Sequence, residues 1–141
     1  MIKSIIVTLL MMSWGIGQAS AAEQEWASLK TAINGKHRSA AHKARDQYRH
    51  PFETLQFFEV KDNLSVLEIW PGAEGWYTEI LAPYLKDKGQ LTVANFTADP
   101  NVPYYQKAAD AFQAKLAADP KLYSKVQSTV LLPPEKLEIV P

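Results

Sequence analysis

The sequence predicts an α/β protein with a parallel β-sheet and crossover helices. After residue 64, segments with strand and helix patterns alternate in the order strand, helix, strand, helix, strand. Such alternation is typical of parallel sheets whose neighbouring strands are joined by helices. Residues 66–69 are apolar except for Glu68, and a nearly continuous apolar run favours an interior strand of such a sheet.

Helices are expected before the alternating part. Residues 22–35 form the first, because Trp26, Leu29 and Ile33 fall on one helical face. A second helical segment, mostly small and basic, covers residues 39–48.

Pro51 is expected to begin a third, short helix, because proline is favoured in the first helical turn. Leu55 and Phe58 would form its buried side.

The alternating part follows a turn at residues 61–63. Strands are predicted over residues 65–70, 90–96 and 125–132, and helices over residues 76–85 and 103–118.

The N-terminus has the pattern of a secretory signal. Lys3 precedes a short apolar run, and small residues at 19–21 favour cleavage before Ala22. The run is shorter than the roughly 20 residues of a spanning helix, so no stable membrane span is expected, an uncleaved anchor being the alternative. The chain has no cysteine, which excludes a lipoprotein anchor and disulfides. We therefore expect a periplasmic or secreted protein.

The length and net charge of the chain bear on its possible partners and on its division into domains. The chain has 141 residues and no net formal charge, so no nucleic-acid partner is expected from bulk electrostatics. We divide it into a signal peptide at 1–21, a helical segment at 22–60 and a sheet domain at 61–141.

The loop after the first strand carries the clearest functional signal, in the stretch VLEIWPGAEGWYTEIL. Gly72 and Gly75 allow backbone angles that a side chain would forbid. In parallel sheets, ligands bind beyond the carboxyl ends of the strands, near the first strand-to-helix turn. Glu68 is placed to hold an amine or hydroxyl of a ligand. The alternative is a tight turn whose glycines serve packing only.

The longer stretch VLEIWPGAEGWYTEILAPYL resembles the first motif of class I S-adenosylmethionine-dependent methyltransferases, which have a Rossmann-like fold. Together with ARDQYRHPFETLQFFEV, it is similar to a family of secreted, predicted bacterial methyltransferases. The resemblance covers nearly all of the chain after the signal. It implies that S-adenosyl-L-methionine is the cofactor and leaves the methyl acceptor unknown.

The resemblance also implies cofactor-binding residues. Glu68, Gly72 and Gly75 would border the methionine part of the cofactor. Asn95 lies near the end of the second predicted strand, where the family has an acidic residue for the ribose hydroxyls. Leu132, after the third strand, would border the adenine by position.

The chain departs from the general methyltransferase pattern at two places in the loop. Trp70 stands where a glycine is usual, and Glu74 is an added or substituted position that we expect to face solvent. Asp99 is an alternative residue for the ribose, or else a turn or helix cap. Core packing is favoured for at least two of Trp70, Trp76 and Tyr77, the alternative being stacking on a ligand.

The basic segment before the sheet contributes weaker candidates. Tyr48, Arg49 and His50 lie in the family-like motif and would line the substrate or cofactor cleft. His50 is a candidate general base, although a helix-capping or packing role is favoured.

The other residues of this basic segment suggest no ligand. Lys36, Arg38 and Lys43 are expected on a solvated face. The spacing of the three histidines matches no compact ligand pattern, so no metal site is expected.

Two functions remain open. The first is methyl transfer, with no catalytic residue assigned.

The family's sheet continues beyond three strands, whereas the predicted strands here end after the third, so we expect the N-terminal half of a family member. An exposed sheet edge would then favour self-association. The second is a non-catalytic periplasmic binding or interaction protein on the same fold. A dinucleotide-binding oxidoreductase is a less favoured third.

Overall fold

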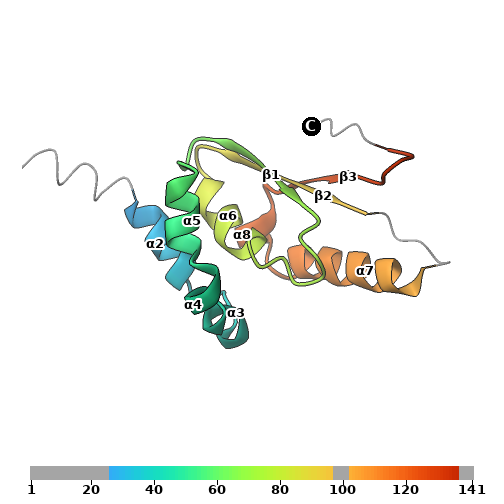
Figure 1. Ribbon diagram of the computed structural model, residues 1–141, viewed down its shortest axis with the longest axis horizontal. Helices are drawn as coiled ribbons and strands as arrows, with labels where there is room; N and C mark the ends of the chain where they lie inside the picture. Colours follow the sequence, from blue (N-terminus) through green and yellow to red (C-terminus); the bar gives the residue numbers. More distant parts are fainter. Residues whose placement is uncertain (1–25, 97–101, 137–141) are drawn as a thin grey trace, which may run out of the picture.

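The computed structural model describes residues 26–96 and 102–136, which form a mixed α/β structure (Figure 1). Three parallel strands and their connecting helices confirm the predicted fold class. The elements are α2 (Ala27–Asn34), α3 (Ala40–Ala44), α4 (Asp46–Arg49), α5 (Pro51–Phe57), β1 (Ser65–Ile69), α6 (Thr78–Leu85), β2 (Gln90–Asn95), α7 (Pro103–Ala118), α8 (Pro120–Tyr123) and β3 (Gln127–Val130).

The sheet has the strand order β1-β2-β3. Glu68 lies opposite Val93 in the first pairing, and Asn95 lies opposite Val130 in the second. Because both pairings are parallel, the carboxyl ends of all three strands meet at one end of the sheet.

The two faces of the sheet differ in cover. The labelled helices lie on one side of the strands in Figure 1. On that side Leu91, Val93 and Asn95 are buried. On the other side, Leu67 and Ile69 keep 41% and 52% of their surface exposed. Side chains alternate between the faces of a strand, so β1 directs these two apolar residues away from the helices.

The predicted strand at residues 65–70 is an edge strand in the described part of the chain, not an interior one. An apolar run with one charged residue suits burial on both faces, but only the helix side of β1 is covered. The sequence pattern of a strand shows which side chains are apolar enough to be buried. It does not show whether another strand or helix lies beside them.

The helical part also differs locally from the prediction. Phe58 is 68% exposed rather than buried. Glu59 adopts a positive φ of 51°, which turns the chain so that Val60 packs against the core instead. After α7, the side chain of Asp119 accepts a hydrogen bond from the N–H of Leu122 and caps α8, a short helix that was not predicted.

A largely buried cluster of ionisable residues joins the N-terminal helices to α6 and α7. We call it the Glu79 cluster: Arg38, His42, Asp46, Glu79 and Lys115. One carboxylate oxygen of Glu79 lies 2.7 Å from His42 Nδ1, and the other accepts from Lys115 Nζ at 2.5 Å. Arg38 donates to both oxygens of Asp46 at 2.7 and 2.8 Å, and its Nε lies 3.8 Å from Glu79.

Arg38 therefore contradicts the prediction of a solvated basic face. It is only 3% exposed and also donates to the carbonyl of Ile33. Its charge is tolerated inside because two carboxylates surround it, an arrangement that residue spacing does not reveal.

Trp76 strengthens the same connection. Its indole N–H donates to the carbonyl of His42 at 3.0 Å. The guanidinium groups of Arg38 and Arg49 lie 5.2 and 4.7 Å from its ring centre, within range of cation–π attraction. His37 Nε2 adds a contact of 2.8 Å to the carbonyl of Glu79.

Glu79→Ala is expected to lower the free energy of unfolding by about 3–5 kcal/mol, because it leaves buried cations without their carboxylate. The measurement is chemical denaturation followed by circular dichroism. Glu135→Ala, at an exposed position, is the control and should change stability by less than about 0.5 kcal/mol. Equal effects of the two substitutions would contradict a structural role for the cluster.

Candidate functional site

The loop between β1 and α6 contains three residues with positive φ: Trp70 at 50°, Gly72 at 72° and Gly75 at 54°. The N–H of Trp70 still donates to the carbonyl of Ala94 at 2.8 Å, so the strand pairing with β2 continues up to the turn. The left-handed backbone at Trp70 is unusual for a residue with a side chain. It stands at the position where the methyltransferase pattern has a glycine.

The two loop glycines serve different needs. A Cβ atom on Gly75 would lie 2.8 Å from both Phe112 Cε2 and Thr78 Oγ1, so no side chain fits. A Cβ atom on Gly72 would meet nothing within 4 Å. Gly75 thus packs the loop onto α7, whereas the backbone at Gly72 borders open space that a ligand is able to enter. Glu74 is exposed, as expected.

Glu68 fixes the start of α6. The hydroxyl of Thr78 donates to Glu68 Oε2 at 2.7 Å, and the backbone N–H of Thr78 supplies a second hydrogen bond. Burial raises the pKa of the Glu68 carboxyl above its usual value, and the two hydrogen bonds from Thr78 partly offset this rise. The predicted ligand-holding carboxylate is therefore engaged inside the protein.

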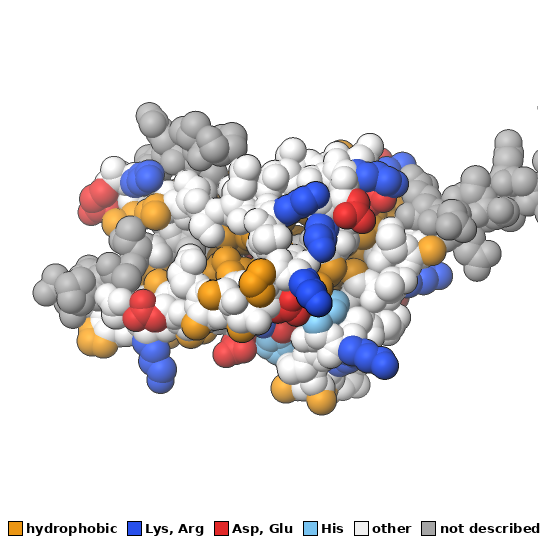
Figure 2. Space-filling model, turned by 180° about the vertical axis from the view of Figure 1, so that it is seen from behind, with side chains coloured by type: hydrophobic (Ala, Val, Ile, Leu, Met, Phe, Trp, Pro, Cys, Tyr) orange, Lys and Arg blue, Asp and Glu red, His pale blue; other side chains and the backbone are white. Residues whose placement is uncertain are grey.

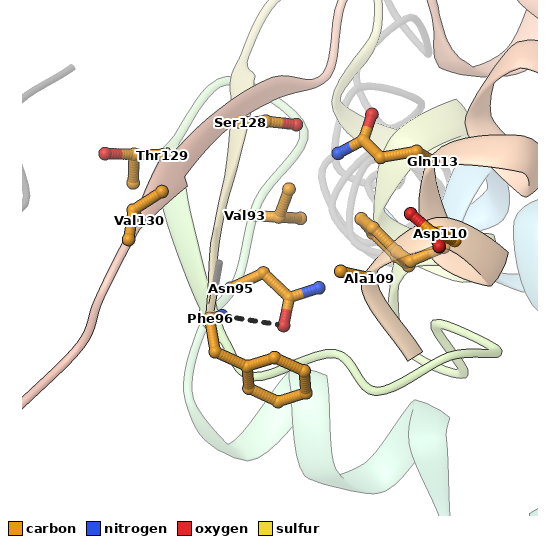
Figure 3. A pocket seen from close by; sticks show the side chains of 10 residues that line it. Val93, Asn95, Phe96, Ala109, Asp110, Gln113, Ser128, Thr129 and Val130 are labelled. Carbon is orange, nitrogen blue, oxygen red and sulfur yellow. Dashed lines mark hydrogen bonds between the residues drawn. The ribbon is translucent and has the colours of Figure 1, made fainter. Parts of the chain in front are cut away.

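A pocket of about 250 Å³ lies between the carboxyl ends of β2 and β3 and helix α7 (Figure 3). We call it the β2–β3 pocket. The side chain of Asn95 accepts a hydrogen bond from the N–H of Phe96 at 3.0 Å, and its amide nitrogen points toward α7. The lining residues are Val93, Asn95, Phe96, Ala109, Asp110, Phe112, Gln113, Ser128, Thr129 and Val130.

Phe112 connects this pocket to the glycine loop. It is fully buried, lines the pocket and packs against Gly75. Since β1 and β2 are neighbours, the turn after Ile69 and the end of β2 at Asn95 also lie side by side. The structure therefore brings Gly75 and Asn95 to one region at the carboxyl end of the sheet.

Other predicted site residues lie elsewhere. Leu132 does not line the pocket; it forms an antiparallel bridge with Lys136 beyond β3. Tyr48 is 78% exposed. His50 has left-handed backbone angles between α4 and α5, and Arg49 lies over the ring of Trp76.

Two aromatic residues behave as expected, because Trp76 and Tyr77 pack in or against the core whereas Trp70 is 52% exposed. Asp99 and the signal segment at 1–21 lie outside the described residues.

Sequence reasoning missed two residues that organise this region. Thr78 lies near the start of a predicted helix, and nothing in the sequence pattern indicates that its hydroxyl donates a hydrogen bond to Glu68. Phe112 is the one aromatic residue inside the alanine-rich part of α7, which was the available signal for a contact with the sheet.

Among residues 26–96 and 102–136, no group of three or more His, Asp or Glu side chains is placed to hold a metal ion. In the same residues no helix is long and apolar enough to cross a membrane. The face in Figure 2 shows basic and acidic side chains interspersed with apolar ones, not a field of one sign.

Comparisons with protein-family models, with curated protein sequences and with solved structures found no match.

Gly75→Ala is expected to destabilise the chain more than Gly72→Ala. Both changes put a side chain on left-handed backbone, at a cost of about 1–2 kcal/mol. Gly75→Ala adds overpacking against Phe112, about 1–3 kcal/mol more. Urea denaturation of both variants measures the difference. Equal losses would show that Gly75 is not packed against α7 as described.

The raised pKa of Glu68 predicts a pH dependence. The folded chain binds this proton more tightly than the unfolded chain, so ionisation of Glu68 costs stability. The loss begins near the ordinary pKa and is complete above the raised one. Glu68→Gln removes the loss, so its stability relative to the parent should rise with pH across that interval. Urea titrations from pH 3.5 to 7 test this, with the exposed Glu53→Gln as control; a flat difference would contradict the prediction.

Proposed function

We propose that the chain binds S-adenosyl-L-methionine at the carboxyl end of its sheet and descends from class I methyltransferases. The main support is that the glycine loop and the β2–β3 pocket are neighbours, because Phe112 both contacts Gly75 and lines the pocket. Ligands of open parallel sheets bind at this end, beside the first strand-to-helix turn. The motif resemblance of residues 66–85 supports the same cofactor.

The described residues offer the cofactor two kinds of contact. Open space beside Gly72 lets a ligand approach the main chain closely. The amide of Asn95, at the pocket wall, is able to donate to or accept from a ribose hydroxyl. Glu68 acts through Thr78, holding α6 and the loop in place rather than touching the ligand.

When bound, the cofactor supplies the methyl group. The chain's part is to orient it against an acceptor and to exclude water, since proximity is the chief expected effect in such a transfer. Tyr48, Arg49 and His50 are proposed to border the acceptor, whose identity stays open. The stacking of Arg49 on Trp76 supports this, because Trp76 follows Gly75 directly. The signal-like residues 1–21 support a periplasmic or secreted location.

A second candidate is a non-catalytic binding or interaction protein on the same fold. The size of the β2–β3 pocket favours it: about 250 Å³ lies below the roughly 300–1,000 Å³ of typical ligand pockets. The hydrogen bond from Thr78 to Glu68 also favours the non-catalytic candidate, because it occupies a carboxylate that was expected to hold the cofactor.

A thermal melt with S-adenosylhomocysteine tests the proposal. Ligand at about 100 times its dissociation constant should add about 2.7 kcal/mol of stability. Gly72→Asn should keep the fold, because asparagine tolerates left-handed backbone, but fill the space beside the loop and reduce the shift.

The controls separate the alternatives. NAD⁺ in place of S-adenosylhomocysteine tests an oxidoreductase, and a shift with it alone would replace the proposal. No shift with either ligand would leave the non-catalytic candidate. A shift unchanged by Gly72→Asn would place the ligand elsewhere.

A further inference from the structure

Strand β1 has an open edge. Within residues 26–96 and 102–136, β1 pairs with β2 only. The N–H of Trp70 donates to Ala94, and the carbonyl of Leu64 accepts from Gln90, so residues 64 and 70 face β2. Alternate residues of a parallel strand bond to opposite sides. Ser65, Leu67 and Ile69 therefore direct their N–H and C=O groups to the open edge.

As far as the structure describes the chain, this edge lacks the features that protect natural sheet edges. Charged side chains, proline and bulges normally prevent edge-to-edge pairing, whereas the outward residues Ser65, Leu67 and Ile69 are uncharged. Three apolar side chains on or beside β1 are 40–52% exposed: Leu64 40%, Leu67 41% and Ile69 52%. Trp70 is different, because its indole N–H donates to the carbonyl of Leu131 after β3 at 3.4 Å. The edge thus combines free backbone groups with exposed apolar surface.

The opposite edge of the sheet is different. Strand β3 has four residues, and Gln127 and Ser128 expose polar side chains. Short, polar edges pair poorly. The structure therefore singles out β1.

The outward positions of β1 are symmetric about Leu67. In an antiparallel pair of two β1 strands, Leu67 lies opposite the partner's Leu67, and Ser65 lies opposite the partner's Ile69. Every outward N–H and C=O group then finds an acceptor or donor. We propose that a second copy of this chain pairs antiparallel along β1, which extends the sheet across a twofold axis at Leu67.

Charge and symmetry select a second copy as the occupant. A twofold interface uses the same patch on both copies, so it needs a strand whose outward groups match themselves in register, as those of β1 do. The opposed residues, Leu67 with Leu67 and Ser65 with Ile69, bring no like charges together, and the whole chain has no net charge to oppose association. This pairing is independent of cofactor binding, so either proposal can fail alone.

The absence of cysteine makes the register directly testable. In the proposed pair, the two Leu67 Cα atoms lie about 5.5 Å apart, within the range of a disulfide. The two Ser65 Cα atoms lie four residues apart along the strands, about 14 Å. Under mild oxidation of the full chain, Leu67→Cys should therefore form a covalent dimer of twice the monomer mass.

Ser65→Cys and Thr92→Cys are the matched controls, the second on the central strand, and neither should form a covalent dimer, although both should still associate through β1. Equal cross-linking of Leu67→Cys and Thr92→Cys, or none of Leu67→Cys, would overturn the proposal.

Light scattering of the full chain supplies a second readout that needs no cysteine. The parent chain should have about twice the monomer mass, and Leu67→Lys should return it to monomer mass. Gln127→Lys places the same charge on β3 and should leave the dimer intact, while circular dichroism verifies that both variants are folded. A monomeric parent chain, or equal dissociation by both lysine variants, would count against pairing through β1.

Discussion

The buried carboxylate of Glu79 is the interaction on which the arrangement of the molecule depends. It accepts from Lys115 of α7 and contacts His42 of α3, so one side chain of α6 joins elements from both ends of the described chain. Removing two or more charges from water costs several kcal/mol each unless partners replace the hydration. Helices α3, α6 and α7 are therefore restricted to arrangements in which the ionisable side chains of the Glu79 cluster contact one another.

Helix α6 is consequently held at its first turn from two directions. Thr78 donates to Glu68 of β1, and the next residue, Glu79, binds the helical segment and α7. The glycine loop between β1 and α6 thus has both of its ends fixed. Gly75 packs against Phe112, which lines the β2–β3 pocket, so the loop, the pocket and the buried charges form one connected region.

Among the residues that the structure describes, the opposite face of the sheet and its β1 edge have no such restraint. Burial is concentrated on the helix side, where Val93 is fully buried, whereas Leu67 and Ile69 remain exposed in the described chain. The contrast separates two functions of one small sheet: its carboxyl end carries the candidate cofactor site, and its β1 edge carries the proposed contact with a second copy.

The sequence by itself determined the order of the three strands and of the crossover helices α6 and α7, because apolar periodicity, glycine and proline act locally; α7 matches its predicted bounds of 103–118. It also located the glycine loop and Asn95. It did not predict α8 or the division of residues 39–48 into α3 and α4. Tertiary structure decided what depends on distant partners. Arg38 is buried because Asp46 and Glu79 surround its charge, and β1 is an edge because no described strand lies beyond it.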